Sequence, residues 1–148
     1  MLRRIAAFGI VVVAFVASGC VSVPMASADK DASAKTFATK PGKGNIYVYR
    51  NEMLGAVQKM SVMFDGKIVG ETASKTYFLF EVAPGKHELI SKGENDSVLA
   101  VTVQDGRNYF VWQEMKMGML VPRTLLHLVD ETTGRAGVAE CKLIEPMP

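Results

Sequence analysis

From Asn45 onward, short apolar runs alternate with turn-forming residues, and this pattern constrains the fold more than any other feature of the chain. The runs are rich in Val, Ile, Tyr and Phe, residues that favour strands. They cover residues 46–50, 61–64, 67–70, 76–82, 87–91, 98–104, 108–114 and 124–129. Short strands separated by turns are typical of two packed sheets. We therefore predict an all-β fold, an antiparallel β-sandwich of about seven or eight strands.

Three residue pairs mark the tightest turns. Asp65-Gly66 and Asp105-Gly106 each stand between two apolar runs, and Pro84-Gly85 precedes another run. An Asp-Gly pair favours a two-residue hairpin because glycine tolerates the positive φ that such a turn requires. Each Asp-Gly pair therefore predicts a hairpin between neighbouring strands.

The end of the chain departs from the strand pattern. Asp130 predicts the start of a short helix, since its carboxylate can cap free backbone amides, and Glu131 is favourable in a first helical turn. Gly134 and Gly137 weaken this helix, because glycine is a poor helix former. A final strand is predicted over residues 142–144.

The first run carries the candidate interaction surface. Tyr47 and Tyr49 fall on the face opposite Ile46 and Val48, because side chains alternate along a strand. Aromatic side chains are frequent anchors of protein interfaces. We therefore name Tyr47, Tyr49 and Arg50 as the candidate interaction surface. In the alternative, the tyrosines pack under the second sheet and Arg50 pairs with a carboxylate.

The N-terminus has the layout of a secretion signal. Arg3 and Arg4 make it basic, an apolar run follows over residues 5–16, and small residues lead to Cys20. The run is shorter than the roughly 18–20 apolar residues that span a bilayer, which indicates a cleaved signal and not a transmembrane helix. Small residues before a cysteine resemble the lipobox of bacterial lipoproteins. That resemblance implies cleavage between Gly19 and Cys20 and acyl chains, such as palmitate, on Cys20.

The predicted domains follow from this cleavage site. Residues 1–19 are the signal peptide, residues 20–44 are the lipidated N-terminus with a flexible linker, and residues 45–148 form the β-sandwich. A rival site at 26–28, an A-x-A pattern, would instead release a soluble protein cut before Asp29.

The location follows by resemblance as well. Lipoproteins retained in the inner membrane commonly carry Asp after the cysteine, whereas Val21 and Ser22 follow Cys20 in this chain. The resemblance therefore implies the outer membrane. We place the domain in the periplasm, with the cell surface as the less favoured side.

Charge and composition argue against nucleic-acid binding and against catalysis. The chain has 17 Lys and Arg and 15 Asp and Glu, and Arg3 and Arg4 would leave with the signal, so the mature protein has no net charge. Nucleic-acid binders usually carry a basic patch. His87 and His127 stand in different runs without partners at ligand or catalytic spacing. We predict no enzyme and no cofactor.

Two further patterns allow sharper interpretations. Met115, Met117 and Met119 alternate, so in an extended chain their thioethers would lie on one side and could bind Cu(I). Packing of these methionines in an apolar gap is the plainer interpretation. Cys141 has no partner if Cys20 is lipidated, and we expect it to be a small buried residue on the last strand rather than a reactive thiol.

Four segments in this order resemble the DUF2846 family of bacterial lipoproteins, a domain of unknown function. The segments are residues 43–50, 64–70, 80–89 and 106–111. The middle segments are also similar to PEGA-type domains. The resemblance covers residues 37–144 and implies a sandwich of the transthyretin or carboxypeptidase-regulatory kind, without an established catalytic site.

These observations together predict a lipid-anchored, non-catalytic envelope protein that binds another envelope protein or a glycan. A structural component of an envelope assembly, such as a secretion-system lipoprotein, is the first alternative. Copper binding through the methionines is the second.

Overall fold

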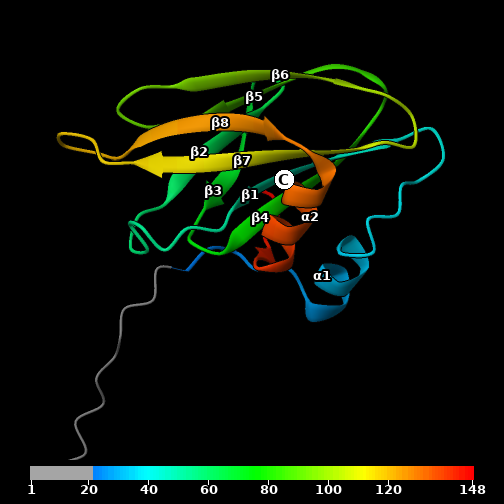
Figure 1. Ribbon diagram of the computed structural model, residues 1–148, viewed down its shortest axis with the longest axis horizontal. Coiled ribbons are helices and arrows are strands. Elements are labelled where there is room, and N and C mark those ends of the chain that lie inside the picture. The colour runs from blue at the N-terminus through cyan, green and yellow to red at the C-terminus, as the bar shows by residue number, and fades with distance from the viewer. Residues whose placement is uncertain (1–21) are drawn as a thin grey trace, which may run out of the picture.

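Two stacked β-sheets form the centre of the protein in a computed structural model, which describes residues 22–148 (Figure 1). The helices are α1 (Ala28–Ala34) and α2 (Glu131–Ala139), and the strands are β1 (Gly44–Arg50), β2 (Met60–Phe64), β3 (Lys67–Thr72), β4 (Thr76–Val82), β5 (Gly85–Ser91), β6 (Ser97–Val103), β7 (Asn108–Lys116), β8 (Arg123–Val129) and β9 (Lys142–Leu143). The predicted β-sandwich is confirmed.

One sheet has the strand order β8-β7-β1-β4-β9 and the other the order β3-β2-β5-β6. Most neighbouring strands are antiparallel, but β1 pairs with β7 and β4 pairs with β9 in parallel. The antiparallel expectation therefore holds for most pairs and fails for these two.

The two Asp-Gly pairs have different outcomes. Asp65-Gly66 joins β2 to β3 in the predicted hairpin, with φ values of 47° and 80°. The hairpin predicted at Asp105-Gly106 is wrong, because β6 and β7 lie in different sheets. The Gly106 N–H donates to the Lys43 carbonyl, which fastens the turn beside the start of β1. The chain therefore crosses between sheets and enters β7 parallel to β1.

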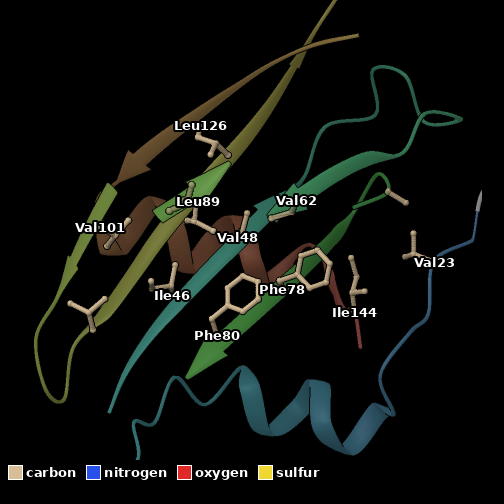
Figure 2. Packing of buried hydrophobic residues seen from close by; sticks show 13 residues of the cluster. Val23, Ile46, Val48, Val62, Phe78, Phe80, Leu89, Val101, Leu126 and Ile144 are labelled. Atoms are coloured by element: carbon tan, nitrogen blue, oxygen red, sulfur yellow. The ribbon is translucent and has the colours of Figure 1, made fainter. Parts of the chain in front are cut away.

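The main core lies between the sheets. Ile46 and Val48 of β1 point into it beside Phe78 and Phe80 of β4, and they meet Leu89 from the opposite sheet (Figure 2). All but Phe80, which is 9% exposed, are inaccessible to solvent. Full burial of each such side chain contributes about 1.5–3 kcal/mol, so the inward half of the strand alternation stabilises the sandwich.

The outward half of β1 is buried as well, which corrects the candidate interaction surface. Tyr47 is 0% and Tyr49 2% exposed. They form a second cluster on the outer face of the five-stranded sheet, covered by α1 and α2 and not by the other sheet. The Tyr47 hydroxyl donates to the Ala34 carbonyl of α1 at 2.8 Å, and its ring stacks on Phe110. Arg50 is also fully buried, so none of the three is available to a partner.

The flexible linker expected over residues 20–44 is wrong for residues 22–44. Val23 packs into the main core, and Met25 forms a β-bridge with Ile144. Ser27 caps α1, whose Asp31 carboxylate accepts the Tyr77 hydroxyl at 2.9 Å. The folded domain therefore includes residues 22–44 and does not begin at Asn45. Gly19 and Cys20, the predicted cleavage and lipidation site, lie outside the described residues.

The predicted helix after Asp130 is confirmed as α2, with Asp130 as its N-cap. Its glycines have a packing role. A Cβ on Gly134 would lie 2.1 Å from Phe110, and one on Gly137 would lie 2.2 Å from Tyr49. Glycine therefore lets the helix rest directly on the aromatic cluster. Neither α1 nor α2, nor any other helix among residues 22–148, is long and apolar enough to cross a membrane.

Candidate functional site

Arg50 is the largest fully buried side chain among the described residues, and it organises the loop that follows it. Its guanidinium donates to the carbonyl oxygens of Gln58 at 2.7 Å, Gly55 at 2.9 Å and Leu54 at 3.2 Å. It also contacts the Met115 sulfur at 3.5 Å. The guanidinium thus satisfies loop carbonyls that no neighbouring strand bonds, and it fixes the path of the loop.

Glu52 is the carboxylate nearest to Arg50. The Arg50 Nε and a Glu52 carboxylate oxygen are 3.8 Å apart, and the other oxygen accepts the Met115 N–H at 3.1 Å. Burial raises the pKa of Glu52, and this effect outweighs the lowering by the Met115 amide and by Arg50. The pairing expected for Arg50 is present, but inside the protein rather than at its surface.

A chain of buried hydrogen bonds crosses between the sheets close to this end. The Thr72 hydroxyl donates to the Gln113 oxygen at 2.5 Å, the Gln113 amide donates to the Ser91 hydroxyl at 2.6 Å, and Ser91 bonds to Thr124 at 2.6 Å. Every member has a partner, so the chain fixes the relative position of the strands. We assign it a structural role.

His87 lies at the opposite end, where it fastens the β2–β3 hairpin. Its Nε2 donates to the Ala83 carbonyl at 2.8 Å, and its Nδ1 faces the Asp65 carboxylate at 2.6 Å. Burial lowers the pKa of His87, but the hydrogen bonds to Asp65 and Ala83 outweigh it and raise the pKa above the usual value of 6.5. For Asp65 burial raises the pKa, and the bonds from His87 and the Glu88 N–H outweigh it, so its pKa lies below 3.8.

These shifts predict a stability window. The contribution of His87 is complete below its unfolded pKa of 6.5 and is lost as the pH rises through its higher folded pKa. The contribution of Asp65 is complete above 3.8 and is lost as the pH falls through its lower folded pKa. We expect the stability difference between the wild type and His87→Gln to be larger at about pH 5 than at about pH 9, measured by urea unfolding. Equal differences at both pH values would contradict this.

The other polar candidates are structural. His127 bonds to Glu114 at 2.7 Å and stacks on Trp112. Cys141 is a free, buried thiol, as expected, although it lies just before β9, and burial raises its pKa to about 12. A thiol with so high a pKa is a poor nucleophile. Within residues 22–148 no three His, Cys, Asp or Glu side chains gather as a metal site.

The three methionines proposed for Cu(I) do not form one site. Met115 is 4% exposed and lies against Arg50, whereas Met117 and Met119 are 76% and 88% exposed. The alternation fails because β7 ends at Lys116 and the chain turns through Gly118.

A groove of about 660 Å³ lies beside β4. Its apolar floor comes from β4 and from the chain after β9, and α1 with the residues behind it forms the other wall. The lining includes Lys30, Ser33, Thr36, Lys40, Leu79, Phe80, Glu81, Val82, Leu143 and Glu145.

This groove follows a strand edge that is only partly paired. β9 covers β4 at Thr76 and Tyr77 and no further. The carbonyls of Lys75 and Tyr77 accept hydrogen bonds from β9 and the residue after it. Because backbone groups of alternate residues face the same side of a strand, Leu79 and Glu81 present their N–H and C=O groups to the groove.

Paired charges stand over the groove. Lys40 and Glu81 are 2.5 Å apart, and Lys30 and Glu145 are 2.7 Å apart. All four side chains are partly exposed, so these pairs are weak and can exchange for other partners. A ligand with an extended backbone and mixed charges fits this arrangement better than a compact anion or cation does.

Comparison with known proteins places the chain in a family. The model of the DUF2846 family, "Protein of unknown function", matches residues 40–124. The chain belongs to the DUF2846 family. It is also 33% identical over 137 residues to an "Uncharacterized protein" of Haemophilus influenzae, a match that covers 90% of this chain and 81% of that protein. No solved structure matches significantly.

The family match confirms the predicted resemblance, although it spans fewer residues than the expected 37–144. The transthyretin-like form of the sandwich stays a prediction. The matched residues hold β1 to β7, while α1, α2 and β9 lie outside them. One wall of the groove therefore comes from parts of the chain that the DUF2846 match does not reach.

Sequence reasoning did not identify the groove. The short final run at residues 142–144 and the longer run at 76–82 were both recognised as strands, but nothing in either indicates that they pair. Once the pairing of these two strands is known, the difference in their lengths shows that part of the β4 edge is open.

Proposed function

We propose that this protein is a lipid-anchored, non-catalytic binding module of the cell envelope, and that its groove holds an extended segment of another envelope protein. The open edge of β4 is the observation that carries the proposal. A peptide laid along it would bond to the backbone of Leu79 and Glu81 and continue the sheet, a common mode of peptide recognition. Alternate peptide side chains would meet the apolar floor.

The groove suits a protein segment for a further reason. An open strand edge attracts unwanted strands, and proteins usually protect it with charge or a covering element. Here Lys40 and Glu81 provide charge, and α1 forms a wall that leaves the edge accessible from one side. Such partial protection favours one extended chain over sheet-to-sheet aggregation.

The anchor part of the proposal rests on the sequence. The basic start, the short apolar run and the small residues before Cys20 support lipidation, and Val21 and Ser22 support the outer membrane with the domain in the periplasm. The groove is also compatible with the alternative function, a structural component of an envelope assembly, because a stable complex could form by the same strand addition.

The groove predicts a selective effect of proline. Glu81→Pro removes an N–H that faces the groove and not β1, so the fold should survive while strand addition is lost. We expect a photoreactive residue at Ser33, on the groove wall, to crosslink a partner in intact cells, and the crosslink to fall at least about tenfold with Glu81→Pro, since one lost hydrogen bond and a steric clash exceed 1.4 kcal/mol.

Glu81→Ala is the matched control, because it removes the same carboxylate and keeps the backbone N–H. It should retain the crosslink. A photoreactive residue at Thr102, exposed on β6 in the other sheet, should capture no common partner. If Glu81→Pro unfolds less than a tenth of the protein and the Ser33 crosslink persists, the groove is not the binding site.

A further inference from the structure

Two loops at one end of the sandwich present apolar side chains to solvent. We call them the tip loops: residues 51–59, between β1 and β2, and residues 117–122, between β7 and β8. Met119 is 88% and Leu120 95% exposed. Met53, Leu54, Val57, Met117 and Val121 are exposed as well. A concentration of exposed apolar residues at one end marks a surface that meets a membrane or another protein.

The tip loops are fixed from inside and lie next to each other. Arg50 holds the first loop through three carbonyls. Glu94 holds the second, because its carboxylate accepts the Met119 N–H at 2.6 Å and a forked pair of bonds from Arg123. A shallow depression is lined by Gln58 and Lys59 of one loop and by Val121 and Pro122 of the other. The exposed apolar side chains therefore lie on loops whose backbones are fixed by hydrogen bonds.

The N-terminal side of the domain lies at this same end. Val23 packs in the main core, and Figure 2 shows it on the side of the sandwich where β3 turns into β4. Ser74, in that turn, donates to the Glu52 carbonyl of the first tip loop at 2.6 Å. In Figure 2 Val23 also lies on the side of the sandwich from which the first tip loop projects.

Chain length then limits how far this end can be from Cys20. Three residue steps separate Cys20 from the buried Val23, and a fully extended chain spans at most roughly 3.3–3.6 Å per residue, or about 10 Å in all. The headgroup region on each side of a bilayer is roughly 5–8 Å thick. If Cys20 carries lipid, the end of the domain that holds Val23 must touch the headgroups.

We propose that the tip loops rest in the headgroup region of the membrane and seat the domain on the lipid surface. This inference rests on the lipid anchor of the proposed function. Met117, Met119 and Leu120 enter between the headgroups, with Met53 and Val57 beside them. Thr76, the first residue of β4, lies at the tip beside Arg50. Leu79 to Val82, which line the groove, lie farther along β4 and away from the tip. The groove would therefore stay clear of the membrane and open to the periplasm.

The test uses the full lipidated chain, purified from membranes and reconstituted in phosphatidylethanolamine–phosphatidylglycerol vesicles with brominated acyl chains. A thiol dye is placed at Met119→Cys or, as the matched control, at Ile68→Cys. Ile68 is an exposed apolar residue next to the Asp65-Gly66 hairpin at the opposite end. Cys141 is buried and does not react. We expect bromine quenching at position 119 and none at position 68.

A second pair of variants tests whether the apolar side chains seat the domain. With the dye at position 119, Leu120→Asp should abolish the quenching, whereas Leu128→Asp, at an exposed leucine near the far end of β8, should leave it unchanged. Both positions are exposed, so neither change should affect folding.

The outcomes separate the inference from the anchor. Flotation with the vesicles that is lost in Cys20→Ser supports the anchor. Flotation with equal, weak quenching at positions 119 and 68 would contradict the contact of the tip loops with the membrane but not the lipid anchor. The exposed apolar residues of the tip loops would then be a surface for a protein partner. A wild-type chain that does not float overturns the anchor, and the inference falls with it.

Discussion

Replacing Arg50 by alanine is expected to lower the free energy of unfolding by about 3–5 kcal/mol, because it removes a buried charge and leaves Glu52 without its compensating partner. The three loop carbonyls that Arg50 bonds also lose their donor. Small domains are stable by about 5–15 kcal/mol, so this change removes a large part of the total. Urea unfolding followed by Trp112 fluorescence measures it.

Three companion variants isolate the cause. Arg50→Lys keeps the charge but cannot reproduce the fork of donors, so it should lose an intermediate amount. Arg50→Met combined with Glu52→Gln should recover part of the loss of Arg50→Met alone, since no unpaired charge remains. Lys40→Ala, which removes an exposed salt bridge, should cost less than about 1 kcal/mol. A loss as small as this for Arg50→Ala would show that the hydrogen bonds and the ion pair of the buried guanidinium contribute little to stability.

Arg50 also shows where sequence reasoning reaches its limit. A basic residue at the end of a β-rich run is usually near the surface, and the sequence predicts either a contact with a partner or a pairing with a carboxylate for Arg50, but not its complete burial. The sequence gives no sign that the next nine residues fold back over the guanidinium. Only the path of residues 51–59 makes the burial evident.

The predicted alternation of side chains along β1 is correct, but the surface predicted on its tyrosine face is wrong. The period of two placed Ile46 and Val48 on one face and Tyr47 and Tyr49 on the other, as the structure has them. Periodicity assigns faces but not what covers them. The cover of the tyrosine face comes from α1 and α2, which lie far apart in sequence and which were predicted as a linker and as a weak helix.

Composition misled the interpretation of residues 22–44. The segment is rich in Ala, Ser, Lys and Thr and has little apolar periodicity. Its attachment depends on a few contacts: Val23 in the core, the Ala34 carbonyl that accepts from Tyr47, and Asp31 at Tyr77 and the Leu143 amide. Such contacts are made by single residues, so no repeating pattern announces them.

The loss of the linker changes what the proposed lipid anchor would do. A flexible segment of 24 residues would hold the domain roughly 25–30 Å from its anchor. With Val23 in the core, only residues 21 and 22 separate the core from Cys20, so a domain anchored through Cys20 as proposed would turn one end toward the membrane. In the proposed arrangement the anchor and the groove belong to one geometry, in which the tip would meet lipid and the edge of β4 would face the periplasm.

Gly137→Ala should destabilise the protein by about 1–3 kcal/mol, although an alanine in a helix is normally better than glycine by about 1 kcal/mol. The added Cβ would lie 2.2 Å from a ring carbon of Tyr49. Tyr49 is 2% exposed and cannot move aside without disturbing the second cluster. Thermal or urea unfolding gives the sign directly.

The sign of the change decides between two explanations of the glycines in α2. Thr132→Ala, at an exposed position of the same helix, is the control and should be neutral or slightly stabilising, as propensity predicts. If steric contact is the cause, Tyr49→Leu should make room for the methyl group, so that Gly137→Ala costs less in that background than in the wild type. A stabilised Gly137→Ala would mean that α2 can lift from the sheet. Its contact with Tyr49 would then add little to stability, and the glycine at position 137 would reflect something other than the close approach of helix and ring.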